Sequence, residues 1–135
     1  ARSEFKHLEF FYFHNCLYEG VWKDNRRRHE ARIPTWDLIR KYAGDWRAVF
    51  VGDAAMSPYE ITMPGGSVEH WNDEAGAVWM KRAREQWARS VWLNPTAERY
   101  WGYTASTRLI AEVMEERMFP LTLDGLDRAM RALMR

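Results

Sequence analysis

The sequence predicts an α/β protein with a mostly parallel sheet, one antiparallel strand and helices on both faces. Short apolar runs alternate with segments whose apolar residues recur every three or four positions, which is the pattern of strands joined by crossover helices. Near the start, two aromatic-rich runs follow each other closely and predict a hairpin, the source of the antiparallel strand.

The composition indicates one globular domain over residues 1–135. Hydrophobic residues make up 47% of the chain and aromatic residues 15%, which excludes a disordered protein. No apolar run approaches the length of a membrane span. The 20 basic and 19 acidic residues nearly cancel, so we expect neither nucleic acid nor a membrane surface as the partner.

A single cysteine, Cys16, cannot form an internal disulfide, and no signal peptide is visible. Both observations favour a cytoplasmic location. The chain begins at Ala1, without Met, and reaches a strand-like run within about ten residues. We therefore expect this chain to be a piece of a longer protein.

The first element after the hairpin, whose strands are expected at residues 9–15 and 17–22, is a short helix. A charged stretch, residues 23–32, lacks apolar periodicity and predicts a surface loop. The helix follows at residues 35–42, with Thr35 as its N-cap and Gly44 as its end.

The apolar run at residues 47–53 is typical of a buried strand of a parallel sheet, and it ends at Asp53. In open α/β sheets ligands bind outside the carboxyl ends of the strands, so this carboxylate is a candidate metal ligand or catalytic group. Alternatively, Asp53 only caps the following turn. The local sequence gives the two interpretations equal weight.

The second half of the chain continues the alternation. Residues 56–72 contain two Pro and two consecutive Gly, and predict a long connection that cannot be regular helix throughout. The expected elements after it are a helix at 73–87, a strand at 90–95 that ends in a turn, a helix from Thr104 or Ser106 to Met114, a strand at 118–121, and a helix at 123–134. We expect Thr122 to cap the last helix, with Leu126, Ala129, Met130 and Leu133 on its buried face.

Five segments together resemble the later part of a von Willebrand factor A domain of the bacterial CoxE-like kind. They are Phe-Tyr-Phe-His-Asn-Cys-Leu-Tyr-Glu-Gly-Val-Trp at 11–22, Pro-Thr-Trp-Asp at 34–37, Phe-Val-Gly-Asp-Ala-Ala-Met-Ser-Pro-Tyr-Glu at 50–60, Val-Trp-Leu-Asn-Pro at 91–95, and Met-Phe-Pro-Leu-Thr-Leu-Asp-Gly-Leu at 118–126. The resemblance covers nearly the whole chain, and the joint occurrence is more specific than any one segment.

The resemblance implies a Rossmann-like domain that holds a divalent cation in a metal-ion-dependent adhesion site. In that family a Thr before a helix and an Asp after the next strand join an Asp-x-Ser-x-Ser motif on the first, central strand. Thr35 and Asp53 match the first two ligands by position, whereas the motif is absent from this sequence. The resemblance therefore implies a domain without its first central strand and first helix.

The implied cofactor is Mg²⁺ or Mn²⁺, in a site that this chain fills only in part. Mg²⁺ prefers hard oxygen ligands in octahedral geometry and keeps several waters, so hydroxyl groups and one or two carboxylates suit it. A site of low charge accepts one more carboxylate from a partner. The alternative for Thr35 is a plain N-cap without any metal.

Three functional hypotheses follow from these residues. The first is a non-catalytic protein-binding module whose partner, by resemblance, is a MoxR-type AAA+ ATPase acting in protein maturation or remodelling. The second is a metal-dependent hydrolase or phosphotransfer domain that uses Asp53 directly; the sequence lacks the second acidic cluster and later Lys expected for it. The third is a fragment that has lost its metal site and binds nothing.

Other groups of residues are weaker candidates. His7, His14, His29 and Cys16 lack the spacing of a zinc site. The basic run at residues 26–28 is interspersed with acidic neighbours and predicts a solvated loop or a protein-docking rim. Trp36, Trp71 and Trp101 lie near predicted loops, where we expect an interface. Without its central strand, the domain should be less stable than a longer protein, or self-associate.

Overall fold

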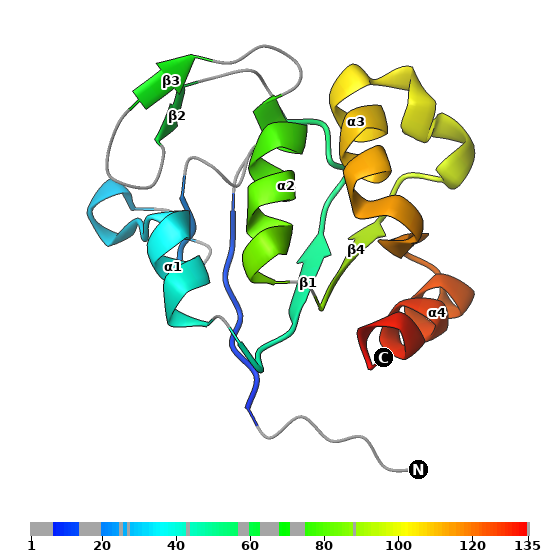
Figure 1. The fold of residues 1–135 in the computed structure, drawn as a ribbon, viewed down its shortest axis with the longest axis horizontal. Helices are drawn as coiled ribbons and strands as arrows, with labels where there is room; N and C mark the ends of the chain where they lie inside the picture. The colour runs from blue at the N-terminus through cyan, green and yellow to red at the C-terminus, as the bar shows by residue number, and fades with distance from the viewer. Residues whose placement is uncertain are drawn as a thin grey trace.

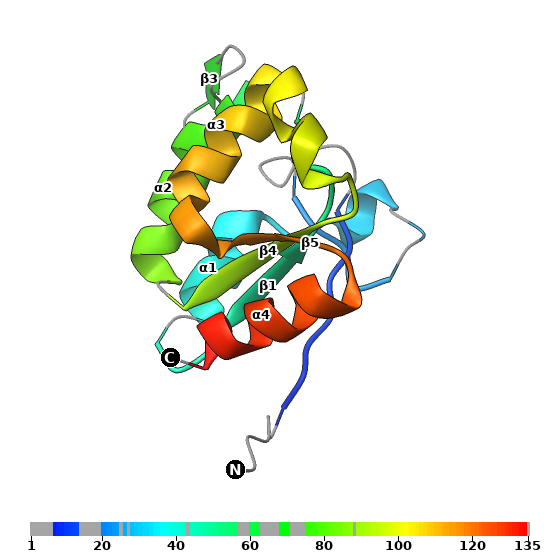
Figure 2. The same ribbon diagram turned by 90° about the vertical axis from the view of Figure 1, so that its right-hand side faces the viewer.

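The computed structural model describes residues 7–13, 20–24, 26, 28–42, 44–56, 60–62, 68–70, 75–87 and 89–134. At its centre is a parallel three-stranded sheet in the order β1-β4-β5, formed by β1 (Ala48–Val51), β4 (Ser90–Asn94) and β5 (Met118–Pro120). Helices cover both faces of this sheet (Figures 1 and 2). The prediction of an α/β fold with parallel strands is confirmed.

A group of helices packs on one face of the sheet and a single helix packs on the other (Figure 2). The first group is α1 (Thr35–Lys41), α2 (Ala75–Gln86) and α3 (Ala105–Met114), and the single helix is α4 (Leu123–Leu133). Short 3₁₀ segments are η2 (His29–Ala31), η3 (Glu98–Tyr103) and η4 (Glu115–Arg117). Among the described residues, no helix combines the length and apolar character needed to cross a bilayer.

The core lies on both sides of β4, whose five residues are all buried. Trp92 stacks on Phe50 of β1, with ring centroids 5.3 Å apart, in the cluster under the three helices. Val91 and Leu93 point the other way and pack with α4. The continuous apolar run of β4 is thus explained by burial on both faces, as expected for a central parallel strand.

β1 is only half covered, which differs from the prediction of a buried strand. Phe50 is buried, but Val49 and Val51 are 43% and 49% exposed. Within the described part of the chain, β1 pairs with β4 alone. Val49 and Val51 share one face because side chains alternate along a strand, and α4 covers β4 and β5 on that face without reaching over them.

The predicted N-terminal hairpin is present only as isolated antiparallel bridges in the described residues. Tyr12 pairs with Trp22, and Val21 pairs with Ile33. Residues 14–19, over which the sequence predicts the rest of the hairpin, lie outside the described residues, and His14 and Cys16 are among them. The parallel sheet therefore does not include the expected antiparallel strand within the described region.

Two other segments differ from the sequence prediction. The connection at 56–72 contains a small antiparallel ladder, β2 (Glu60–Thr62) with β3 (Val68–His70). In α4, the cap is confirmed because the Gly125 amide donates to Thr122 Oγ1 at 3.0 Å. Leu126, however, is 40% exposed instead of buried, because Ala129, Ala132 and Leu133 form the stripe that packs on the sheet.

Candidate functional site

Asp53 follows β1 directly, at the carboxyl edge of the sheet, and its side chain is exposed. One carboxylate oxygen, Oδ1, accepts a hydrogen bond of 3.0 Å from the Ala55 amide. This is the turn-capping role that the sequence left open. The other oxygen makes no hydrogen bond with the described residues, so the carboxylate still has acceptor capacity toward a ligand.

The backbone that carries Asp53 is held by side chains from β4 and α3. Asn94 Nδ2 donates to the Asp53 carbonyl at 3.2 Å, and Thr107 Oγ1 donates to the same oxygen at 3.1 Å. Ser106 Oγ donates to the Ala54 carbonyl at 2.9 Å and accepts from the Met56 amide at 3.1 Å. Ser106, Thr107 and Asn94 are all buried, so these bonds are shielded from competing water.

We call these hydrogen bonds from Asn94, Ser106 and Thr107 the clamp. The clamp supports an unfavourable backbone conformation at Ala54. Ala54 has φ 63°, in the left-handed region that costs an L-residue with a side chain roughly 1–2 kcal/mol. Its side chain is buried at 3% exposure. Strained residues that persist because their surroundings hold them are concentrated at binding and catalytic sites. The turn therefore presents the Asp53 carboxylate in a fixed position.

Asn94 connects the three strand ends of this edge. Besides its bond to Asp53, its Oδ1 accepts from the Thr96 amide at 2.9 Å, and its carbonyl accepts from the Leu121 amide at 2.8 Å. The loops after β1, β4 and β5 are thus linked through one side chain and its backbone. Sequence reasoning missed Asn94, Ser106 and Thr107 as site residues, although a polar residue ending the apolar run of β4 repeats the pattern at Asp53.

Exposed apolar and aromatic side chains occur in the segments that continue from this edge. They come from the segments that follow β4 and β5: Tyr100, Tyr103, Leu121, Leu123 and Leu126. Tyr103 is 80% exposed and Leu123 is 89% exposed. We call these five residues the apolar rim. Aromatic side chains beside a fixed polar group are characteristic of surfaces that bind proteins.

The structure places Thr35 differently from the prediction. Pro34 occupies the N-cap position, and Thr35 is the first residue inside α1, buried at 4% exposure. Thr35 is not the N-cap because Pro, with its fixed φ, precedes the first turn. The hydrogen bonds that hold Asp53 lead to β4 and α3, whereas α1 lies on the other side of α2 (Figure 1). A cation shared by Thr35 and Asp53 stays a prediction.

The described residues around Asp53 supply only some of the ligands that a metal ion would need. Within the described ranges, no three His, Cys, Asp or Glu side chains come together as a metal-binding group. Asp53 offers one carboxylate with free acceptor capacity, and the neighbouring hydroxyl groups of Ser106 and Thr107 are engaged with backbone carbonyls. These residues fit one corner of a Mg²⁺ site that keeps its waters, and they do not enclose an ion by themselves.

Of the three Trp expected at an interface, the structure describes the side chain of Trp101. It is buried at 9% exposure, and its indole Nε1 donates to the Thr96 carbonyl at 2.8 Å. Trp101 thus anchors η3 beneath the apolar rim instead of contributing to it. The side chain of Trp36 and all of Trp71 lie outside the described residues.

No protein-family model, curated protein or solved structure matches this chain significantly.

Proposed function

We propose that this chain is part of a von Willebrand A domain of the CoxE-like kind that binds a protein partner at the carboxyl edge of its sheet. The partner class is a MoxR-type AAA+ ATPase acting in protein maturation or remodelling in the cytoplasm. The domain itself is not an enzyme. The observation that carries the proposal is Asp53, an exposed carboxylate on a clamped, strained turn beside the apolar rim.

The order of the sheet supports the family part of the proposal. Three parallel strands, β1-β4-β5, are joined by helices that cover both faces. A missing central strand next to β1 would account for the outer edge of β1, which pairs with no strand of the described residues. A missing helix on that strand accounts for the exposure of Val49 and Val51, because a crossover helix packs over the strand it follows.

The apolar rim supports binding of a protein in preference to turnover of a small molecule. Its exposed side chains belong to η3, to the residue after β5 and to the first turns of α4, and none of them lines the pocket described below. Small-molecule sites are concave and bury most of their ligand. Exposed apolar and aromatic side chains together with a polar contact are typical of a protein interface.

In the complete domain, Asp53 would hold a divalent cation together with groups from the central strand, and Thr35 would join it as the second ligand from this chain. The bound cation would supply an open coordination position for a carboxylate of the partner. This chain's own contribution is to keep Asp53 fixed through Asn94, Ser106 and Thr107.

Calorimetric titration with Mg²⁺ and Mn²⁺ tests the proposal. We expect a chain extended upstream by one strand and one helix to bind the cation, and Asp53→Ala to abolish binding. Asp45→Ala, which removes an equally exposed carboxylate at the other end of β1, is the matched control and should bind normally. Absence of binding in the extended chain would remove the metal from the proposal.

The same proteins distinguish a binding module from a metal-dependent hydrolase or phosphotransfer domain. Phosphate release from a generic phosphomonoester is measured with Mg²⁺ present. Turnover that requires the metal and is lost in Asp53→Ala would establish the enzyme. Metal-dependent capture of an AAA+ ATPase without turnover would establish the binding module.

A further inference from the structure

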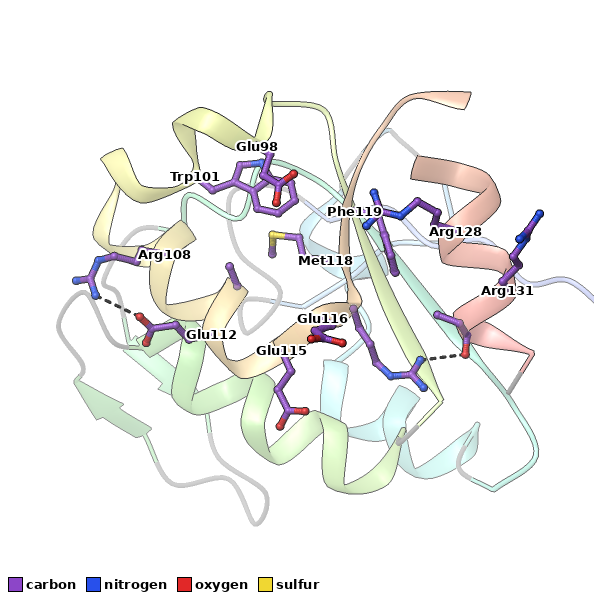
Figure 3. A pocket seen from close by; sticks show the side chains of 13 residues that line it. Glu98, Trp101, Arg108, Glu112, Glu115, Glu116, Met118, Phe119, Arg128 and Arg131 are labelled. Carbon is purple, nitrogen blue, oxygen red and sulfur yellow. Dashed lines mark hydrogen bonds and ion pairs between the residues drawn. The ribbon is translucent and has the colours of Figure 1, made fainter. Parts of the chain in front are cut away.

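A second surface, whose lining does not include Asp53, lies between the α3–η4 segment and α4 (Figure 3). It is an open groove of about 1130 Å³. Its floor is formed by Trp101, Met118 and Phe119, and charged side chains form its two walls. β5 runs along this floor as the outer strand of the sheet.

The basic wall is already neutralised. Arg128 and Arg131 project from α4 and pair with Asp124 and Asp127 of the same helix, at 3.6 Å and 3.1 Å. The Arg128 guanidinium also lies 5.3 Å from the centre of the Phe119 ring. Arg117, between the walls, donates to the carbonyls of Ser90 and Ala132 and ties η4 to β4 and α4.

The wall on the α3–η4 side contains one ion pair, Arg108 with Glu112 at 3.6 Å, and three further carboxylates. Glu98 of η3 and Glu115 and Glu116 of η4 are exposed and line the groove. None of their three side-chain carboxylates makes a hydrogen bond or an ion pair with another described residue. Unpaired carboxylates over an apolar floor favour a ligand that brings positive charge and an apolar side chain together.

We propose that this groove binds a basic peptide segment of a partner protein, with Lys or Arg side chains against Glu98 and Glu116 and an apolar side chain on the Met118–Phe119 floor. The groove is too open to enclose a small cation. Nucleic acid and anionic lipid are disfavoured, because the unpaired charges have the same sign as phosphate. This inference is independent of the metal proposal, since Asp53 takes no part in it.

The experiment uses three fluorescein-labelled ten-residue peptides as probes: alternating Arg and Leu, alternating Arg and Ser, and alternating Glu and Leu. Binding is followed by fluorescence anisotropy at about 0.15 M salt, where contacts between separated charges are screened. We expect the Arg/Leu peptide to bind at least tenfold tighter than either of the others. Equal binding of the Arg/Ser peptide would overturn the role of the floor.

The double variant Glu98→Gln/Glu116→Gln should weaken binding of the Arg/Leu peptide at least fivefold. Its matched control is Glu30→Gln/Glu85→Gln, which makes the same change in net charge at two exposed positions outside the groove. Circular dichroism should show the same fold for both. An equal loss in the two double variants, or no binding of the Arg/Leu peptide by the unmodified protein, would overturn the proposal.

A second copy of this chain is the competing occupant. Sedimentation velocity over a range of protein concentrations decides this point. A dimer that dissociates in Glu98→Gln/Glu116→Gln would overturn the assignment to a partner peptide, whereas association that is unaffected by these substitutions leaves the groove free for the peptide.

Discussion

Two residues with side chains, Ala54 and Glu115, have positive φ among the described residues. Ala54 supports the turn of Asp53, and Glu115 joins α3 to η4 at the wall of the groove. Each therefore lies at a surface for which we propose binding. Strain of this kind costs roughly 1–3 kcal/mol of folding stability. We infer that the backbone conformation of both surfaces is maintained at the expense of stability.

Glu115→Gly should stabilise the protein by about 1 kcal/mol. Its backbone, φ 57° and ψ −123°, is favoured only for Gly, and the exposed side chain loses no packing. The relief of strain outweighs the extra freedom that Gly gives the unfolded chain, roughly 0.4–1 kcal/mol. Denaturant unfolding measures the difference.

The neighbouring residue is the control for that prediction. Glu116 has φ −89°, which an L-residue adopts easily, so Glu116→Gly gains no relief and should destabilise by about 0.5–1 kcal/mol. Destabilisation by both substitutions would show that the backbone at Glu115 is not strained.

The pKa of Glu9 is lowered from its ordinary value of 4.5, first by the hydrogen bond from Lys23 and then by the charge of Lys23. A pKa that is lowered in the folded state stabilises that state at pH values above the ordinary pKa. This contribution is lost as the pH falls through the lowered pKa. Because Glu9 is exposed, the effect on overall stability is small. The pair nevertheless joins the segment before Tyr12 to the one after Trp22.

Lys23→Met should therefore raise the pKa of Glu9 to near 4.5, measured by NMR titration of its side-chain carboxyl group. Met keeps an apolar stem over the Phe11 ring, where the Lys23 ammonium lies 4.4 Å from the ring centre. Lys41→Met is the comparison, and it should raise the pKa much less, because Lys41 acts only through its charge and ranks below Lys23. Equal changes in the pKa of Glu9 in the two variants would contradict the hydrogen bond from Lys23 to Glu9.

At the scale of elements, the packing of α4 on β5 depends on Gly125. A Cβ at this position would lie 1.8 Å from the Pro120 carbonyl oxygen, far inside contact distance. Gly125→Ala should destabilise by about 3 kcal/mol, the upper part of the range for overpacking. In an unobstructed helix the same change would be stabilising, by about 1 kcal/mol.

Gly102→Ala is the control for this prediction, since no atom lies within 4 Å of the added Cβ. Thermal unfolding of the two variants should show a large fall in Tm for Gly125→Ala and little change for Gly102→Ala. A normal Tm for Gly125→Ala would mean that α4 can move away from β5 at little cost.

Elements with strong periodicity were predictable from the sequence, and elements that depend on distant partners were not. β4 and α4 are within one residue of the expected ranges because each carries its own pattern: a continuous apolar run, and an amphipathic helix with a capping Thr122. The β2–β3 ladder has three residues on each strand and leaves no comparable pattern. The exposure of Leu126 depends on how α4 is rotated on the sheet, which periodicity fixes only coarsely.

The residues of the candidate site also differ in how far the sequence could predict them. Asp53 was predictable because a carboxylate after an apolar run stands out in the sequence. Ser106 and Thr107 reach the Asp53 turn across more than fifty residues of chain, by way of α2 and β4. A contact of that range has no local sequence pattern, so these clamping residues emerge only when the sheet is assembled.

For the whole molecule, the two edges of the sheet differ in their protection. β5 is three residues long and ends in Pro120, which has no amide to offer a further strand. β1 has no Pro and no charged residue, and it bears exposed Val49 and Val51. The amides of Ala48 and Gly52 bond toward β4, so the alternate residues Val49 and Val51 direct their amides and carbonyls to the open edge.

This chain should therefore self-associate through β1. Sedimentation velocity should show an average mass that rises with concentration, and Val51→Lys should restore the monomer, because a Lys at a strand edge opposes pairing with a second strand. Leu123→Lys is the matched control. It introduces the same charge at a more exposed apolar residue, on α4 instead of the sheet edge, and should leave the association intact. If a chain extended upstream by one strand and one helix is monomeric and more stable, the added strand occupies the outer edge of β1, as proposed. If the unextended chain is already a highly stable monomer, β1 needs no further neighbour, and the proposal of a missing central strand fails.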